Sequence, residues 1–93
     1  MNSVAAVAKH VFVAGRVQGV GFRWHTRARA RELGLGGWVR NLTDGRVEVW
    51  VEGASAPVEA MLTWLHEGAP GARVDEVKVS DATMVGHREF RVT

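Results

Sequence analysis

The 93-residue sequence contains no cysteine, so neither a disulfide bond nor thiol chemistry is available to it. This composition fits a reducing compartment, and we expect a cytoplasmic protein. No apolar run approaches the ~20 residues that a membrane helix needs, so we expect no membrane association. Residues 1–8 contain only five consecutive apolar residues and no basic start, which is too little for a secretory signal. We expect this leader to be frayed.

Several signatures of phosphate and metal sites are also missing. Cysteine-phosphatase chemistry is excluded, and the sequence has neither a Gly-x-x-x-x-Gly-Lys-Ser/Thr nucleotide loop nor a dinucleotide fingerprint. The histidines show no metal-ligand spacing with acidic partners, so we expect no metal ion and no other cofactor. These histidines are His10, His25, His66 and His87.

Positive charge is concentrated in residues 22–46, where six arginines face only two acidic residues. The six are Arg23, Arg27, Arg29, Arg31, Arg40 and Arg46. Such a local excess indicates an anionic partner. We expect Arg27, Arg29 and Arg31, however, to form a solvated helix surface.

The stretch over residues 15–23 has the features of an anion-binding turn. It follows the β-branched run 11–13, contains no proline, and therefore offers successive backbone N–H groups ahead of a helical pattern. Its three glycines can adopt positive φ angles without strain; they are Gly15, Gly19 and Gly21. Arg23 adds a planar guanidinium that matches a phosphate or carboxylate through two parallel hydrogen bonds.

Hydrophobic periodicity predicts strands and helices in alternation. The expected strands cover residues 10–14, 38–42, 46–52, 73–81 and 88–92, and the expected helices cover residues 22–33 and 55–67. The buried helix stripes are expected at Phe22, Thr26, Ala30 and Leu33, and at Val58, Met61, Leu62 and Leu65. Gly34 is expected to end the first helix, and Ser55 to cap the second. Residues 43–45 read as a hairpin turn, and Val47, Val49 and Val51 alternate with outward residues.

This order predicts an α+β fold, a ferredoxin-like α/β sandwich of βαββαβ type with a short terminal strand. Both helices cover one face of a mainly antiparallel sheet, within one domain over residues 1–93. The first two strands are then parallel, with the third between them, so their carboxyl ends meet at one sheet edge. Arg23 and Asn41 can therefore face one pocket across ~10 Å, which is two strand spacings.

Two motifs together resemble the signatures of the acylphosphatase family. They are GRVQGVGFR over residues 15–23 and GWVRNLTDGRV over residues 37–47, the second pattern closing at Gly53. Length and element order are similar over the rest of the chain. The family often carries an aromatic residue near its carboxyl end, whereas this sequence has Thr93 there.

The resemblance implies an enzyme that hydrolyses acyl phosphates to a carboxylate and inorganic phosphate, without a metal. It assigns phosphate binding to Arg23 and orientation of the attacking water to Asn41, and it implies small-molecule partners. The size of the chain and its lack of a long apolar edge favour a monomer. The backbone amides of residues 16–22 would cradle the phosphate. The substrate-binding residues it implies are Val17, Gln18, Gly19, Val20, Gly21 and Phe22.

Two other functions are compatible with this order of strands and helices. RNA-recognition domains stack bases on aromatics of an open sheet face, and Phe12 and Trp50 are candidates for that role. Glu48 and Glu52, however, flank Trp50 and would repel a phosphate backbone, so we expect Trp50 to pack against a neighbouring strand or stay partly exposed. A non-catalytic module that binds acyl phosphates or other anions would need the loop but not Asn41.

Overall fold

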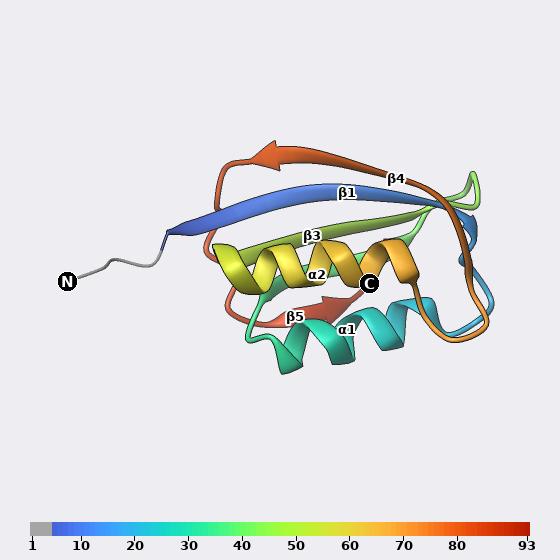
Figure 1. Cartoon of the computed structure of the whole chain (residues 1–93), viewed down its shortest axis with the longest axis horizontal. Coiled ribbons are helices and arrows are strands. Elements are labelled where there is room, and N and C mark those ends of the chain that lie inside the picture. The colour runs from blue at the N-terminus through green and yellow to red at the C-terminus, as the bar shows by residue number, and fades with distance from the viewer. Residues whose placement is uncertain (1–4) are drawn as a thin grey trace.

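The computed structural model describes residues 5–93 and contains five strands and two helices (Figure 1). In chain order these are β1 (Ala6–Arg16), α1 (Phe22–Glu32), β2 (Gly36–Asn41), β3 (Val47–Ala54), α2 (Ser55–Glu67), β4 (Arg73–Ala82) and β5 (Phe90–Val92). The strands form one sheet in the order β4-β1-β3-β2-β5. This arrangement confirms the predicted ferredoxin-like topology, including β3 between the parallel strands β1 and β2.

The sheet is antiparallel except at one edge, where β5 pairs in parallel with β2. Both helices pack on the same face: α1 lies over β2 and β5, and α2 lies over β1, β3 and β4. The inward valines of β3 are fully buried, and the predicted α2 stripe and most of the α1 stripe are buried as well. Apolar residues that recur every second position in β3 and every 3.6 positions in the helices therefore meet in one shared core.

The amino-terminal strand is longer than predicted. β1 begins at Ala6, and Ala6, Val7 and Ala8 pair with Ala54, Gly53 and Glu52 of β3. The predicted fraying of residues 6–8 is therefore wrong, because a neighbouring strand satisfies their backbone hydrogen bonds, which composition does not reveal. The predicted fraying of residues 1–4 lies outside the described residues.

The predicted cap of α2 is also wrong. Ala54 occupies the N-cap position and makes no side-chain cap, whereas Ser55 is the first helical residue. The Ser55 N–H donates instead to the carbonyl of Ala5, at 2.9 Å, so the extended chain before β1 satisfies it. Within residues 5–93, neither helix combines the length and the apolar content that crossing a membrane would require.

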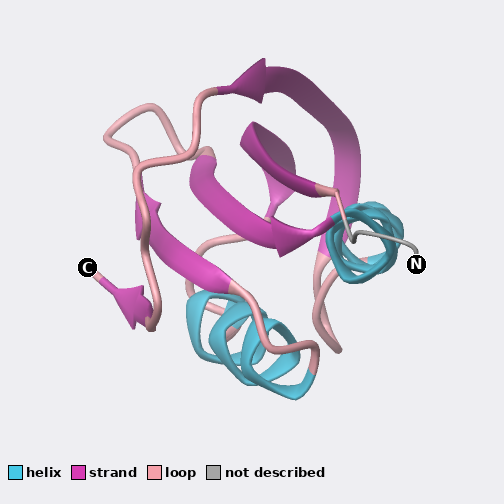
Figure 2. Cartoon of the chain, turned by 90° about the vertical axis from the view of Figure 1, so that its left-hand side faces the viewer, coloured by secondary structure: helices cyan, strands magenta, loops and turns pink. Residues whose placement is uncertain are grey.

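Glu52 ties the connection between β4 and β5 to the sheet. Figure 2 shows this connection passing across the end of the sheet between its two edge strands. The Glu52 side chain is almost completely buried and accepts hydrogen bonds from the amides of Val85, Gly86 and His87, and from the Trp50 indole at 2.9 Å. Burial opposes ionisation of Glu52, but these four donors outweigh it and lower the pKa of the carboxyl below 4.5.

We therefore expect Glu52→Gln to destabilise the protein at pH 7 by about 1.5–3 kcal/mol, the range for hydrogen bonds to a charged group. A carboxyl group whose pKa is lower in the folded state than in the unfolded state stabilises the fold at any pH above its unfolded pKa. This stabilisation is lost as the pH falls through the folded-state pKa. Urea unfolding should therefore show a smaller loss of stability between pH 7 and pH 3 in the variant. The exposed Glu67→Gln is the matched control; an equal acid sensitivity in wild type and Glu52→Gln would contradict this account.

Candidate active site

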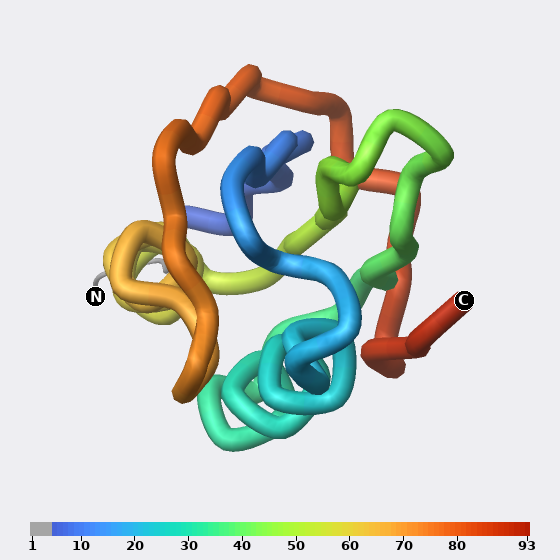
Figure 3. The backbone as a smooth tube through the Cα atoms, turned by 90° about the vertical axis from the view of Figure 1, so that its right-hand side faces the viewer, coloured from blue at the N-terminus to red at the C-terminus, as the bar shows by residue number. Residues whose placement is uncertain are grey.

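The carboxyl ends of β1 and β2 meet at one end of the sheet, seen end-on in Figure 3. In register, Val13 of β1 and Asn41 of β2 both pair with Val47 of β3. Paired residues lie on the same sheet face, and Val13 and Val47 are core residues, so Asn41 projects on the helix side. Asn41 is thereby placed on the face that carries the start of α1.

The turn between β1 and α1 has the predicted backbone. Gly15, Gly19 and Gly21 have φ angles of 135°, 75° and 76°, and no other residue type in the described chain has a positive φ. Gly15 cannot be replaced freely, because a Cβ there would lie 2.1 Å from the carbonyl oxygen of Arg73. Gly21 is the N-cap of α1, which has no side-chain cap, so the first-turn amides remain available to a ligand.

Gln18 holds this loop against the β2–β3 hairpin. Its side-chain amide donates to the carbonyls of Leu42, at 2.8 Å, and Arg46, at 2.9 Å. These two carbonyls belong to the hairpin turn, which is closed by the bond from the Leu42 N–H to the Arg46 carbonyl. The side chain of Gln18 thus fixes the loop relative to the strand that carries Asn41, while its backbone stays in the loop.

Arg23 lies in the first turn of α1, where the sequence predicted it. Its Nη1 atom donates to the carbonyl oxygen of Thr93, at 3.1 Å, and the Thr93 N–H donates to the Val39 carbonyl, at 2.9 Å. The guanidinium is therefore oriented by a residue that is itself held against β2. No aspartate or glutamate side chain among residues 5–93 pairs with Arg23, so no acidic side chain competes with an anion for its charge.

A cavity of about 150 Å³ brings the predicted residues together. Its lining consists of Val17, Gly19, Gly21, Phe22, Arg23, Trp24 and Asn41. Gln18 and Val20 do not line it; Gln18 acts as the loop tether, and Val20 packs against the core. Sequence analysis did not assign Trp24 to the site; only the structure shows this side chain, 58% exposed, in the lining beside Arg23. His25 is exposed beside Gly21 and outside the lining.

The cavity suits a small anion. No carboxylate lines it, whereas one guanidinium and the open amides of the glycine turn do. The nearby Asp44 carboxylate is already engaged by the backbone N–H and guanidinium of Arg46, at 3.0 and 2.9 Å. Within residues 5–93, no group of three acidic or histidine side chains is arranged to hold a metal ion.

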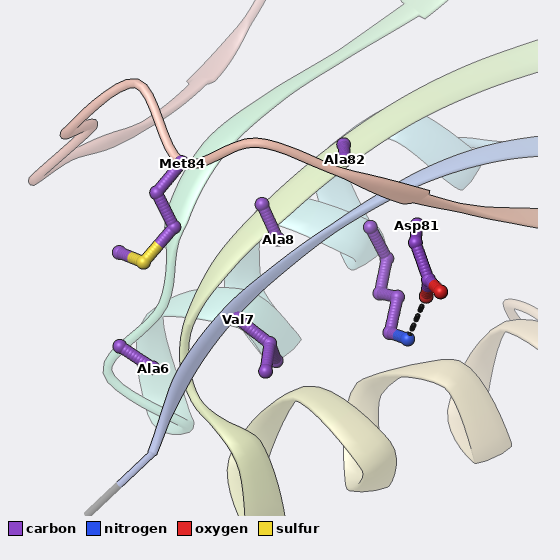
Figure 4. A pocket seen from close by; sticks show the side chains of 7 residues that line it. Ala6, Val7, Ala8, Asp81, Ala82 and Met84 are labelled. Atoms are coloured by element: carbon purple, nitrogen blue, oxygen red, sulfur yellow. Dashed lines mark hydrogen bonds and ion pairs between the residues drawn. The ribbon is translucent and has the colours of Figure 1, made fainter.

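A larger cavity, of about 420 Å³, lies at the opposite end of β1 (Figure 4). It is lined mainly by alanines, Val7 and Met84, and its two charged residues, Lys9 and Asp81, pair with each other. This pair leaves no free charge to hold a phosphate. The smaller cavity at the glycine turn is therefore the candidate active site.

The open face of the sheet carries a self-contained polar and aromatic cluster. Trp50 stacks on Trp38 of the adjacent strand, with ring centroids 6.4 Å apart, which confirms the predicted packing of Trp50. Glu48 is buried between Arg40, at 2.5 Å, and His10, at 2.6 Å. Burial opposes ionisation of Glu48, yet these two partners lower the pKa of its carboxyl. The aromatic rings are thus engaged with each other and with neighbouring charged groups.

The fold is a ferredoxin-like sandwich, and the glycine turn after its first strand forms a cradle suited to a small anion. The acylphosphatase family model matches residues 9–92, and the chain belongs to the acylphosphatase family. An acylphosphatase of Trichormus variabilis is 57% identical over 83 residues, which cover 89% of this chain and 82% of that protein.

Solved structures agree with this assignment. An acylphosphatase from Bacillus subtilis superposes with a TM-score of 0.91 at 34% identity, covering 94% of this chain and 98% of that one. An acylphosphatase from Coxiella burnetii gives the same TM-score of 0.91 at 40% identity, covering 95% of this chain and 93% of the other. The fold and the family therefore agree over almost the entire chain.

Proposed function

We propose that Arg23, the amides of residues 16–22 and Asn41 divide the work of acyl phosphate hydrolysis between them. The protein is an acylphosphatase, an enzyme that cleaves the carboxyl–phosphate bond of acyl phosphates to a carboxylate and inorganic phosphate. The observation that carries the division of labour is the 150 Å³ cavity, which has Arg23, Asn41 and the glycine turn in its lining.

The chemistry needs little more than these groups. A carboxylate is a good leaving group, so the main task is to position the phosphoryl group and stabilise its spreading charge. Arg23 and the loop amides bind the phosphoryl oxygens. Asn41 has both a donor and an acceptor, and it orients a water in line with the phosphorus. The water oxygen bonds to phosphorus, the acyl oxygen leaves as carboxylate, and a phosphate oxygen takes the proton.

The same features support proposals about the partners, the compartment and the oligomeric state. The protein acts on small molecules, in line with the volume of the cavity, and in the cytoplasm, in line with the absence of cysteine; the small size of the chain favours a monomer. The closed aromatic cluster on the open sheet face and its buried Glu48 support the absence of nucleic-acid binding. The presence of Asn41 in the cavity favours turnover over simple anion binding.

A benzoyl phosphate assay in the presence of a chelator tests the reaction directly. We expect full turnover in EDTA and no stimulation by added Mg²⁺, because the lining provides no cluster of metal ligands. The control is enzyme dialysed against buffer without chelator. Loss of activity in EDTA with recovery on adding a divalent cation would overturn the metal-free reaction, and absence of turnover in all conditions would favour a binding module.

Inorganic phosphate should compete with the substrate and stabilise the fold. Phosphate that binds only the folded state at ten times its Kd stabilises it by about 1.4 kcal/mol, which raises Tm by roughly 6–11 °C. Thermal unfolding in phosphate, against sulfate-free chloride buffer of equal ionic strength, measures this shift. Non-competitive inhibition, or an unchanged Tm at saturating phosphate, would count against the site.

A further inference from the structure

A second cavity adjoins the candidate active site between α1 and β5, which lie side by side in Figure 1. It measures about 270 Å³, and its lining consists of Trp24, Arg27, Arg31, Phe90, Arg91 and Val92. Sequence analysis placed Arg27 and Arg31 on a solvated helix surface. The structure agrees for Arg31, which is exposed, and places it with the half-buried Arg27 along a hollow that Phe90 and Val92 of β5 also line.

Trp24 lines both cavities, so they are neighbours that share this residue. Since α1 begins at the phosphate cradle, the second cavity extends from the cradle along the helix. Arg23 and Arg27 are separated by one helical turn, ~6 Å along the axis, and lie on the same side of α1. A group attached to a phosphate at Arg23 can therefore run past the Trp24 ring towards Arg27.

The cavity is strongly positive. Three arginines and no carboxylate line it. Arg27 and Arg31 make no ion pair within residues 5–93, and Arg91 is paired only with the exposed Glu89, at 3.4 Å. The Arg27 guanidinium lies over the Trp24 ring, 5.5 Å from its centroid, so it is already held at the cavity wall. Arg29, on the opposite flank of the helix, pairs with Glu32 and does not line the cavity.

We propose that Trp24, Arg27 and Arg31 form a subsite for the acyl group, selective for acyl phosphates that carry a second anionic group distal to the reacting phosphate. The acyl body lies against Trp24, and its distal carboxylate or phosphate meets Arg27 and Arg31. This inference rests on the proposed function, because it places the phosphoryl group at Arg23. Arg27 and Arg31 act in substrate binding and take no part in the bond changes.

Two matched substrates test the subsite: 4-carboxybenzoyl phosphate and its uncharged analogue 4-carbamoylbenzoyl phosphate. The measured quantity is kcat/KM for the charged substrate divided by kcat/KM for the uncharged one. It is determined in wild type, Arg27→Gln and Arg31→Gln, with Arg29→Gln as the control for loss of charge on the same helix. Comparison of ratios between variants cancels both the intrinsic reactivity of each acyl phosphate and any partial unfolding. Loss of one exposed ion pair predicts that Arg27→Gln lowers the ratio by about 1.4- to 5-fold.

The fall should come from a higher KM for the charged substrate with kcat unchanged, because a distal group is bound equally in ground and transition states. The wild-type ratio should also decrease as salt is added. The inference is overturned if Arg27→Gln and Arg31→Gln leave the ratio unchanged, or if Arg29→Gln lowers it equally. Hydrolysis of neither substrate by wild type would instead overturn the proposed function, which separates the two failures.

Discussion

Replacing Arg23 by lysine is expected to lower kcat/KM for benzoyl phosphate by about 10³-fold, the lower range for an arginine that stabilises a transferring phosphoryl group. Lysine keeps the positive charge but replaces a rigid fork of donors with a single ammonium on a flexible stem. Phosphate affinity should fall together with turnover, since Arg23 is proposed to hold the phosphoryl oxygens both before and during the reaction. The two losses are measured by steady-state kinetics and by calorimetry with inorganic phosphate.

The control for this experiment is Arg29→Lys, which makes the same exchange on the opposite flank of α1. A second effect must be separated, because Arg23 also donates to the Thr93 carbonyl. Urea unfolding of Arg23→Lys monitors that structural contact independently of catalysis. Normal phosphate affinity and normal kcat in a folded Arg23→Lys protein would contradict the role assigned to Arg23.

Removing the side chain of Asn41 should affect the reaction differently. Asn41→Ala is expected to reduce kcat by about 10²–10³-fold, corresponding to ~2.7–4 kcal/mol for the loss of one oriented donor in an active site. Phosphate affinity should hardly change, because the lost interaction is made with the attacking water rather than with the bound anion. In free-energy terms, the variant loses an interaction made mainly in the transition state.

The paired measurement again combines kcat from a continuous assay with phosphate affinity from calorimetry. Thr43→Ala is the control, since Thr43 is an exposed residue of the same hairpin and does not line the cavity. Either of two results would show that the division of labour is wrong: an Asn41→Ala protein that no longer binds phosphate, or one that hydrolyses substrate at the normal rate.

The local sequence was sufficient to predict the strands, the helices and the backbone conformation of the glycine turn that forms the anion cradle. Positive φ angles at Gly19 and Gly21 follow from their missing Cβ atoms, and the buried α2 stripe follows from the helical period. The short connections of a βαββαβ chain leave few topologies, so the placement of Asn41 near the first loop could also be inferred before the structure was known. Each of these properties depends on residues within a few positions or on general rules of chain connection.

Only the tertiary structure shows which residues far apart in the sequence form hydrogen bonds with one another. Gln18 anchors its loop to carbonyls 24 and 28 residues away, and Arg23 meets a carbonyl 70 residues away. Glu52, predicted only as an outward strand residue, is buried by the amides of residues 85–87. Whether a polar side chain is solvated or paired depends on strand register and on loops that cross over it, and no local pattern encodes either. For the same reason, the sequence shows Arg27 and Arg31 only as charge on a helix surface, and the fold alone shows that both line one cavity.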